Sequence, residues 1–277
     1  MKRRYLLVFW MMAAIYHHSI AQSGSLEIIY KKVDDIALSM IVVYPDDFDP
    51  TQASPAIVFF YGGGWVEGTV EQFKPQARHL AGRGMVAFLV DYRVESRHGT
   101  TPFESLKDAK SAIRFIRGNA HLLGVDPYRI AGAGGSAGGQ LAAATALIEG
   151  FNEESDDLSV SSRPDALVLF NPVLDNGPNG FGFDKIGDEY PSVSPLHNVN
   201  PGAPPTIMFL GTKDSLIPVE TLQAFKLQMQ DAGSHCELIL YEDQGHGFFN
   251  YHFPVYYNKT LKETERFLMQ RGLIKRD

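Results

Sequence analysis

Along the chain, short apolar runs alternate with segments that carry apolar residues at helical spacing. Ala56–Tyr61 and Ala166–Phe170 are continuous apolar runs, which are typical of strands covered on both faces. Phe103–Arg117 instead has apolar residues three or four positions apart, which predicts an amphipathic helix. Strands that alternate with helices over this length predict an α/β fold, with a mostly parallel central sheet and helices on both faces.

The same patterns assign the remaining segments. The predicted strands are Leu26–Val33, Ile36–Tyr44, Ala56–Tyr61, Met85–Val90, Arg129–Gly132, Ala166–Phe170, Thr206–Leu210 and Glu237–Tyr241. The predicted helices are Phe73–Gly82, Phe103–Arg117, Ala137–Ile148, Val219–Ala232 and Tyr257–Arg271. Asp34 and Asp35 predict a hairpin turn. Gly150–Pro164 and Asp175–Pro205 interrupt the alternation, and loops of this length either flank a functional pocket or are solvated excursions.

The first 21 residues have the pattern of a cleavable leader. Three basic residues precede the apolar run Tyr5–Tyr16, and the small residue Ala21 stands where a signal peptidase reads. We predict a signal peptide over residues 1–21, one catalytic domain over residues 22–277, and a secreted or periplasmic protein. An uncleaved anchor is the alternative, although a membrane span needs about 20 apolar residues.

Composition narrows the class of protein. The chain is 44% hydrophobic and 21% charged, as in a globular domain. Its net charge of −7 becomes −10 without the leader, because 22 basic residues then face 32 acidic ones. This charge argues against nucleic-acid binding and against attraction to an anionic membrane surface. The single cysteine, Cys236, excludes an intramolecular disulfide, and its apolar surroundings predict a buried packing role.

A serine lies in the segment Gly134-Gly135-Ser136-Ala137-Gly138, which fits the pattern G-x-S-x-G between a predicted strand and a predicted helix. So sharp a turn needs small neighbours, because larger side chains would collide across it. The hydroxyl then lies at a helix N-terminus, whose dipole stabilises negative charge. The segment lacks the lysine of a Walker loop, and Ser136 stands where a dinucleotide fingerprint has its last glycine. We predict Ser136 as a nucleophile.

A second glycine segment, Tyr61-Gly62-Gly63-Gly64-Trp65, follows the predicted strand that ends near Phe60. Glycines allow the backbone to approach a substrate closely with its N–H groups unshielded. We predict that the N–H groups of Gly63, Gly64 and Ala137 form an oxyanion hole.

A serine nucleophile needs a general base and a carboxylate that orients it. His246 follows the last predicted strand and is the predicted base, and Asp214 follows the strand before it and is the predicted acid. Asp175 is the main alternative acid, whereas Asp243 and Glu242 are so near His246 in sequence that we expect them to point away. Three other histidines fall in predicted loops and stay open as pocket residues: His98, His197 and His252.

Together these segments resemble the α/β-hydrolase superfamily, in particular the esterase branch related to hormone-sensitive lipase and to secreted bacterial carbohydrate acetyl- and feruloyl-esterases. The resemblance covers about residues 25–272. It implies an α/β-hydrolase fold without a large cap domain, and a catalytic triad of Ser136, Asp214 and His246. In the family a histidine usually stands where this chain has Tyr61, and often where it has Gln140.

The resemblance also extends to Asp91-Tyr92-Arg93, which we expect to brace the glycine loop through hydrogen bonds. It implies a secreted serine carboxylic ester hydrolase that removes short acyl groups from carbohydrate or other small esters, with acetyl xylan and feruloyl esters among the expected substrates. A generalist short-chain esterase is the nearest alternative.

Two other functions remain open. A prolyl-oligopeptidase-like peptidase shares the triad but normally carries a large propeller that 277 residues do not accommodate. A non-catalytic binding protein on the same fold would typically lose a triad residue. No metal or organic cofactor is expected, since the sequence has no H-E-x-x-H pattern. The expected partner is a small ester or an acylated saccharide substrate, and no nucleic acid is expected to bind. The protein is expected not to insert stably into a membrane once the leader is removed. The oligomeric state is not determined by these patterns.

Overall fold

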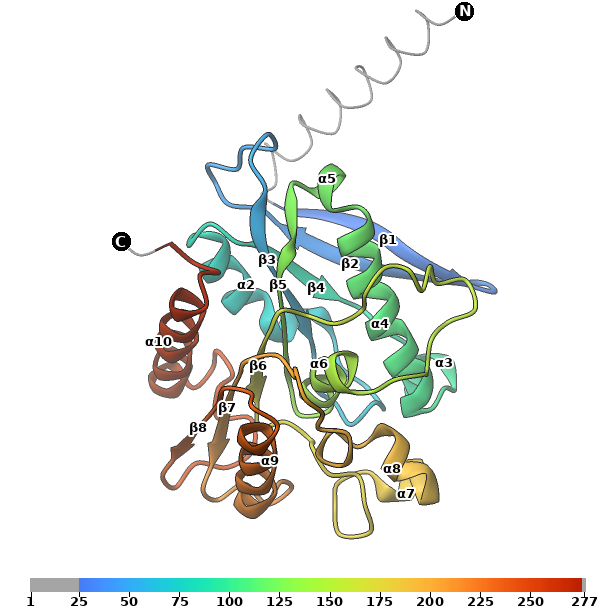
Figure 1. Cartoon of the computed structure of the whole chain (residues 1–277), viewed down its shortest axis with the longest axis vertical. Coiled ribbons are helices and arrows are strands. Elements are labelled where there is room, and N and C mark those ends of the chain that lie inside the picture. The colour runs from blue at the N-terminus through green and yellow to red at the C-terminus, as the bar shows by residue number, and fades with distance from the viewer. Residues whose placement is uncertain (1–24, 276–277) are drawn as a thin grey trace, which may run out of the picture.

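An eight-stranded sheet forms the centre of the molecule (Figure 1). The computed structural model describes residues 25–275, so the leader predicted at residues 1–21 lies outside the described residues. The strand order is β1-β2-β4-β3-β5-β6-β7-β8. β2 pairs antiparallel with β1 and with β4, and all other neighbouring strands are parallel. The predicted α/β fold with a mostly parallel sheet is confirmed.

The strands follow the apolar runs closely. They are β1 Ser25–Val33, β2 Ile36–Val43, β3 Ser54–Phe60, β4 Val86–Val90, β5 Val125–Gly135, β6 Ala166–Phe170, β7 Thr206–Gly211 and β8 Cys236–Tyr241. β5 is much longer than the predicted Arg129–Gly132. Its first residues include Asp126 and Pro127 and its last are glycines, so its ends carry no apolar signal although their backbone pairs with the neighbouring strands.

The helices include every one predicted and several short ones besides. The α-helices are α2 Lys74–Ala81, α3 Glu95–His98, α4 Pro102–Gly118, α5 Ala120–Leu123, α6 Ala137–Leu147, α7 Phe183–Ile186, α8 Tyr190–Val193, α9 Val219–Asp231 and α10 Pro254–Gln270. The 3-10 helices are η1 Val70–Phe73, η2 Gly187–Glu189 and η3 Pro195–His197.

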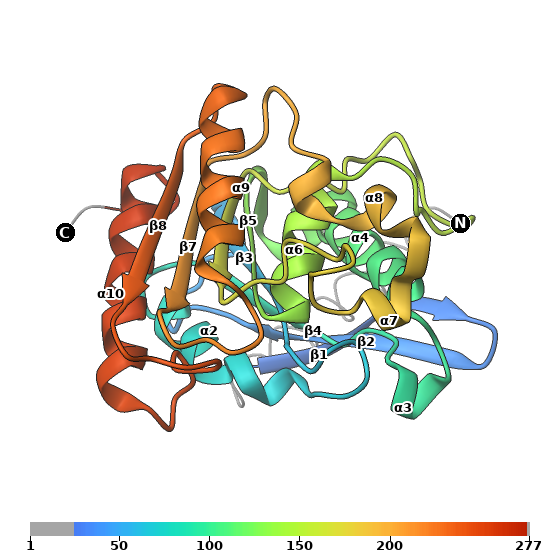
Figure 2. The same ribbon diagram turned by 90° about the horizontal axis from the view of Figure 1, so that it is seen from below.

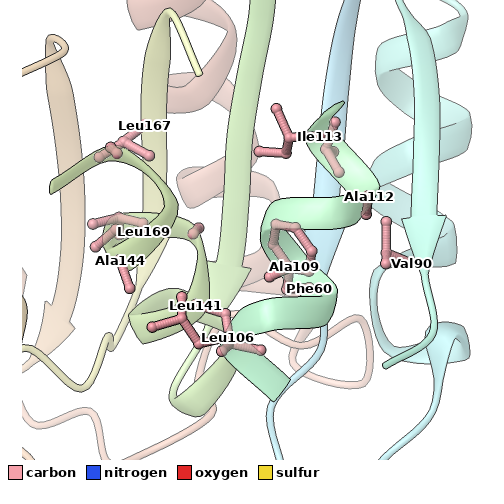
Figure 3. Packing of buried hydrophobic residues seen from close by; sticks show 14 of the residues in the cluster. Phe60, Val90, Leu106, Ala109, Ala112, Ile113, Leu141, Ala144, Leu167 and Leu169 are labelled. Atoms are coloured by element: carbon pink, nitrogen blue, oxygen red, sulfur yellow. The ribbon is translucent and has the colours of Figure 1, made fainter. Parts of the chain in front are cut away.

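Each central strand contributes side chains to two hydrophobic cores, one on each face of the sheet. In β6, Leu167 and Leu169 belong to one core, and Val168 and Phe170 belong to the other. Helices α4, α6 and α9 cover the first face, where Leu106 and other side chains of α4 and α6 pack together (Figure 3). Helices α2 and α10 cover the second face (Figure 2). Because both faces are covered, the central strands β3, β4, β6 and β7 have no polar side, as the sequence predicted.

The segment between β6 and β7, expected as a long loop, contains the short helices α7, η2, α8 and η3. Ile186 and Val193 are buried there, and the segment contacts α6 and α9. Helices of three or four residues are too short to show an amphipathic repeat, so the sequence pattern did not reveal them. Within residues 25–275 no segment forms a separate cap domain, which confirms that prediction.

The polar stretch Gly150–Pro164 contains no helix or strand. Ion pairs of Glu153 with buried lysine and arginine side chains hold it against the rest of the domain. Glu153 pairs with Lys31 at 2.8 Å and with Arg93 at 2.9 Å. Both cations also contact the fully buried Asp108. None of the residues of this stretch lines the cavity described below.

Cys236 is buried at the start of β8, as expected, and burial raises the pKa of its thiol to about 12. Of the helices within residues 25–275, none is long and apolar enough to cross a membrane. The described residues also hold no group of three or more histidine, cysteine or acidic side chains that could bind a metal ion.

Candidate active site

Ser136 occupies the turn between β5 and α6. Its backbone φ of 53° and ψ of −120° lie in a region that residues other than glycine rarely adopt. A Cβ atom on Gly138 would lie 2.1 Å from the carbonyl oxygen of Phe60, and one on Gly134 would lie 2.3 Å from that of Gly138. The turn therefore requires glycine at both positions. Ala137 begins α6, so its N–H group has no partner within the helix.

Hydrogen bonds join Ser136, His246 and Asp214, which follow three different strands. Ser136 Oγ lies 3.0 Å from His246 Nε2, and His246 Nδ1 lies 2.8 Å from Asp214 Oδ2. Because an ionised carboxylate only accepts, Nδ1 carries the proton and Nε2 presents its lone pair to the serine hydroxyl. This arrangement can move a proton from the serine to the imidazole.

The carboxylate of Asp214 is held from its other side as well. Its Oδ1 accepts hydrogen bonds from the backbone N–H groups of Leu216, at 2.9 Å, and Ile217, at 3.0 Å. The side chain of Asp214 has no exposed surface, whereas that of His246 keeps 24% of its own. The acid is therefore fixed and shielded from water, while the imidazole reaches the solvent.

The alternative acids lie elsewhere. Asp175 Oδ1 accepts a hydrogen bond from the N–H of Gly177 at 2.8 Å, within the segment before α7. Asp243 pairs with Lys213 at 2.7 Å on the surface, and Glu242 is exposed. The loop histidines considered as pocket residues do not line the cavity at Ser136: His98, His197 and His252.

The glycine loop after β3 lies directly against the serine. A Cβ atom on Gly62 would lie 3.3 Å from Ser136 Cβ, and the N–H of Gly62 donates to Gln72 Oε1 at 2.7 Å. Gly63 and Gly64 line the same cavity as Ser136, with φ of 133° and 62°. At these φ values any other residue would be strained. The loop thus brings the two predicted oxyanion residues beside the nucleophile.

Tyr61, where the family usually has histidine, anchors this loop through a partly buried network. Its hydroxyl donates to Asp91 Oδ1 at 2.7 Å and accepts from Arg97 Nη2 at 2.7 Å. Its carbonyl oxygen accepts from the Tyr92 hydroxyl at 2.7 Å, and the two tyrosine rings stack 4.2 Å apart. Burial and then the Asp91 charge raise the pKa of Tyr61 well above its usual value. The expected brace is present for Asp91 and Tyr92, whereas Arg93 binds Asp108 instead.

A cavity of about 400 Å³ opens at Ser136 and His246. Among residues 25–275, Lys185 is the one lysine, arginine or acidic residue in its wall, and it pairs with Glu95 at 3.0 Å. This pair joins α7 to α3, which approach each other at one side of the molecule (Figure 2). The apolar side chains of the wall are Val66, Phe181, Leu216 and Phe249.

Three amide side chains that the sequence analysis did not single out connect the loops of the site. Gln72 Nε2 donates to Asn250 Oδ1 at 3.1 Å, and Asn250 Nδ2 donates to the carbonyl oxygen of Gly247 at 2.8 Å. Asn171 Oδ1 accepts from the N–H of Gly247 at 3.0 Å. Asn171 directly follows β6, so the strand-end rule that indicated Asp214 could also have indicated this residue.

The known proteins to which this chain is similar are esterases. The BD-FAE family model matches residues 43–178, and the dienelactone hydrolase family model matches residues 186–269. Esterase LipC of Mycobacterium tuberculosis is 30% identical over 221 residues, which cover 72% of this chain and 54% of that protein. Carboxylesterase NlhH of the same species is 40% identical over 96 residues, 34% of this chain and 29% of that protein. The chain thus spans about half the length, or less, of these curated relatives.

Solved structures give matches of nearly full length. The apo form of esterase 2 from Thermogutta terrifontis has a TM-score of 0.89 and 42% identity, covering 92% of this chain and 97% of that one. The same esterase with propionate bound gives a TM-score of 0.88, and with butyrate bound 0.87, at the same coverage. It has also been solved phosphorylated by paraoxon.

We expect Tyr61→Phe to loosen the glycine loop without removing the Asp91–Arg97 pair. The lost hydrogen bond to a charged group should lower the free energy of unfolding by about 1.5–3 kcal/mol. The kcat for ester hydrolysis should fall about tenfold, less than the ~10²–10³-fold loss of a whole oxyanion donor. Urea denaturation and steady-state kinetics measure the two effects. The exposed Tyr128→Phe serves as the control, and equal behaviour of the two variants would contradict the anchoring role.

Proposed function

Because the chain belongs to the α/β-hydrolase family of serine esterases, we propose that it hydrolyses small carboxylic esters through an acyl group carried on Ser136. One observation carries this proposal: the unbroken hydrogen-bonded chain from Ser136 through His246 to Asp214 at the wall of a cavity. A nucleophile, a base with its lone pair free and a buried carboxylate are the groups that acyl transfer needs.

In the first half of the reaction, Ser136 Oγ forms a bond to the ester carbonyl carbon while His246 Nε2 takes the hydroxyl proton. The carbonyl oxygen becomes an oxyanion, and its proposed donors are the N–H groups of Gly63, Gly64 and Ala137. Asp214 stays ionised and stabilises the imidazolium. Collapse of the intermediate breaks the bond to the alcohol oxygen, which leaves with the proton from His246.

In the second half, a water molecule gives a proton to His246 and attacks the acyl carbon. The second tetrahedral intermediate expels Ser136 Oγ, which recovers the proton, and the carboxylic acid leaves. These steps use only water and groups of this chain.

The proposed substrates carry short acyl groups, and acylated saccharides are among them. The cavity of about 400 Å³ has four apolar side chains in its wall, which suit the apolar chain of an acyl group. The propionate and butyrate complexes of the similar Thermogutta terrifontis esterase support a short acyl group. The saccharide part of the proposal rests on the sequence resemblance to secreted carbohydrate esterases and on the predicted leader.

Ser136→Ala should lower kcat/KM for p-nitrophenyl acetate by about 10⁴-fold or more, because the nucleophile is lost. It should also abolish labelling by a fluorophosphonate probe. Ser192→Ala is the matched control and should keep both properties, because Ser192 is exposed on α8 and its hydroxyl donates to the carbonyl oxygen of Glu189 at 2.7 Å. Undiminished hydrolysis by a folded Ser136→Ala variant would show that another group is the nucleophile.

A series of p-nitrophenyl esters from acetate to laurate should give the highest kcat/KM at acetate to butyrate, since the acids bound in the similar esterase are of this length. Release of acetate from acetylated xylan tests the saccharide part separately. A maximum at laurate would refute the proposed acyl size, and inertness towards acetylated xylan and methyl ferulate would remove carbohydrate esters from the proposal.

We propose that the predicted leader, residues 1–21, is removed in the host, so that the mature protein begins at Gln22. Intact-mass spectrometry of protein from the medium or cell envelope measures this directly. A chain that retains residues 1–21 in the membrane fraction would instead support the uncleaved anchor.

A further inference from the structure

Asn171 faces the catalytic nitrogen of the proposed base. Its Nδ2 lies 3.3 Å from His246 Nε2, the same atom that faces Ser136 Oγ. We propose that Asn171 is a positioning residue that keeps Nε2 free of a proton and directed at Ser136. This inference rests on the proposed function and assigns to the site a fourth side chain, which neither the sequence motifs nor the triad includes.

The orientation of the Asn171 amide follows from its other contact. The backbone N–H of Gly247 can only donate, and it lies 3.0 Å from the oxygen, Oδ1. The NH₂ group must therefore be the end that faces His246. Since His246 Nδ1 donates to Asp214, Nε2 is the acceptor for this amide as well as for the serine hydroxyl.

The backbone holds the amide in this place. Asn171 has a φ of 34°, and its N–H donates to the carbonyl oxygen of Phe209 at 2.7 Å. Asparagine adopts positive φ more readily than most side chains do. The residue is 1% exposed, so its NH₂ group has few competing water molecules. A buried donor fixed beside Nε2 stabilises the neutral imidazole and opposes protonation of that nitrogen.

Few charges act on this imidazole. Asp214 faces Nδ1 at 2.8 Å, and Lys185 lies in the cavity wall. Lys213 and Asp243 on the flanking loops form an exposed pair with each other at 2.7 Å. Protonation of Nε2 should therefore depend on whether residue 171 presents a hydrogen-bond donor or an acceptor to it.

The test compares the pH dependence of kcat/KM for p-nitrophenyl acetate in wild type, Asn171→Asp and Asn171→Gly. Aspartate keeps the size of the side chain and its bond to Gly247 but presents an acceptor to Nε2. A carboxylate this close to an imidazolium favours the protonated form by about 1–3 pH units. We expect the acid limb of the profile to move up by about one unit or more in Asn171→Asp, and by less in Asn171→Gly, which removes the donor and the bond to Gly247 but adds no acceptor.

Asn250→Ala is the matched control, because Asn250 also holds Gly247 but has no contact with the imidazole among the hydrogen bonds of the described residues. Whatever this variant does to the rate, its acid limb should stay at the wild-type position. A shift in Asn250→Ala equal to that in Asn171→Asp would mean that loosening of the Gly247 turn is the cause. An unchanged acid limb in Asn171→Asp would also overturn the inference.

Titration of the His246 ring by ¹⁵N NMR, assigned through His246→Gln, gives a second measurement without substrate. It should show the same upward shift in Asn171→Asp, and no shift would refute the role of Asn171. If wild type cleaves no ester, the proposed function fails, and this titration still decides whether Asn171 controls protonation of the ring.

Discussion

Backbone contact between the end of β3 and the serine turn after β5 is the constraint on which the whole site depends. Position 138 lies so close to the carbonyl oxygens of Phe60 and Tyr61 that no side chain fits between them. The same Tyr61 carbonyl is held from behind by Tyr92. The separation of the nucleophile from the glycine loop is therefore set by main chain rather than by mobile side chains. Such preorganisation lets fixed dipoles stabilise a developing charge without rearrangement.

The parallel sheet then gathers the rest of the chemistry at one edge. Each of five neighbouring strands ends in a loop that contributes one part, in the order β3, β5, β6, β7 and β8. The parts in that order are the glycine loop, Ser136, Asn171, Asp214 and His246. Because strand ends are held about 4.8 Å apart by the ladders, Ser136 and His246 meet within hydrogen-bond distance although they are 110 residues apart in the chain.

Much of this was predictable from the sequence. Continuous apolar runs indicated the buried strands, and strand-end placement brought Ser136, Asp214 and His246 to one edge, where the structure joins them by hydrogen bonds. The hydrogen bonds of the side-chain amides were not predictable in the same way. Gln72 and Asn250 are 178 residues apart, and a pair of polar residues produces no repeating pattern in the sequence. Arg97, which completes the Tyr61 network, sits on a helix of four residues that has no repeat to detect.

Cys236 has a practical consequence of its own. It is the sole thiol of the chain and lies at the start of β8, the edge strand, with 4% of its surface exposed. Burial raises the pKa of this thiol to about 12. Only the thiolate reacts with oxidants and alkylating reagents. Thiol reagents should therefore leave the native protein unlabelled. A cysteine introduced near α7 would then be the site at which a fluorophore or spin label attaches. The wall of the cavity could then be observed directly while substrate binds.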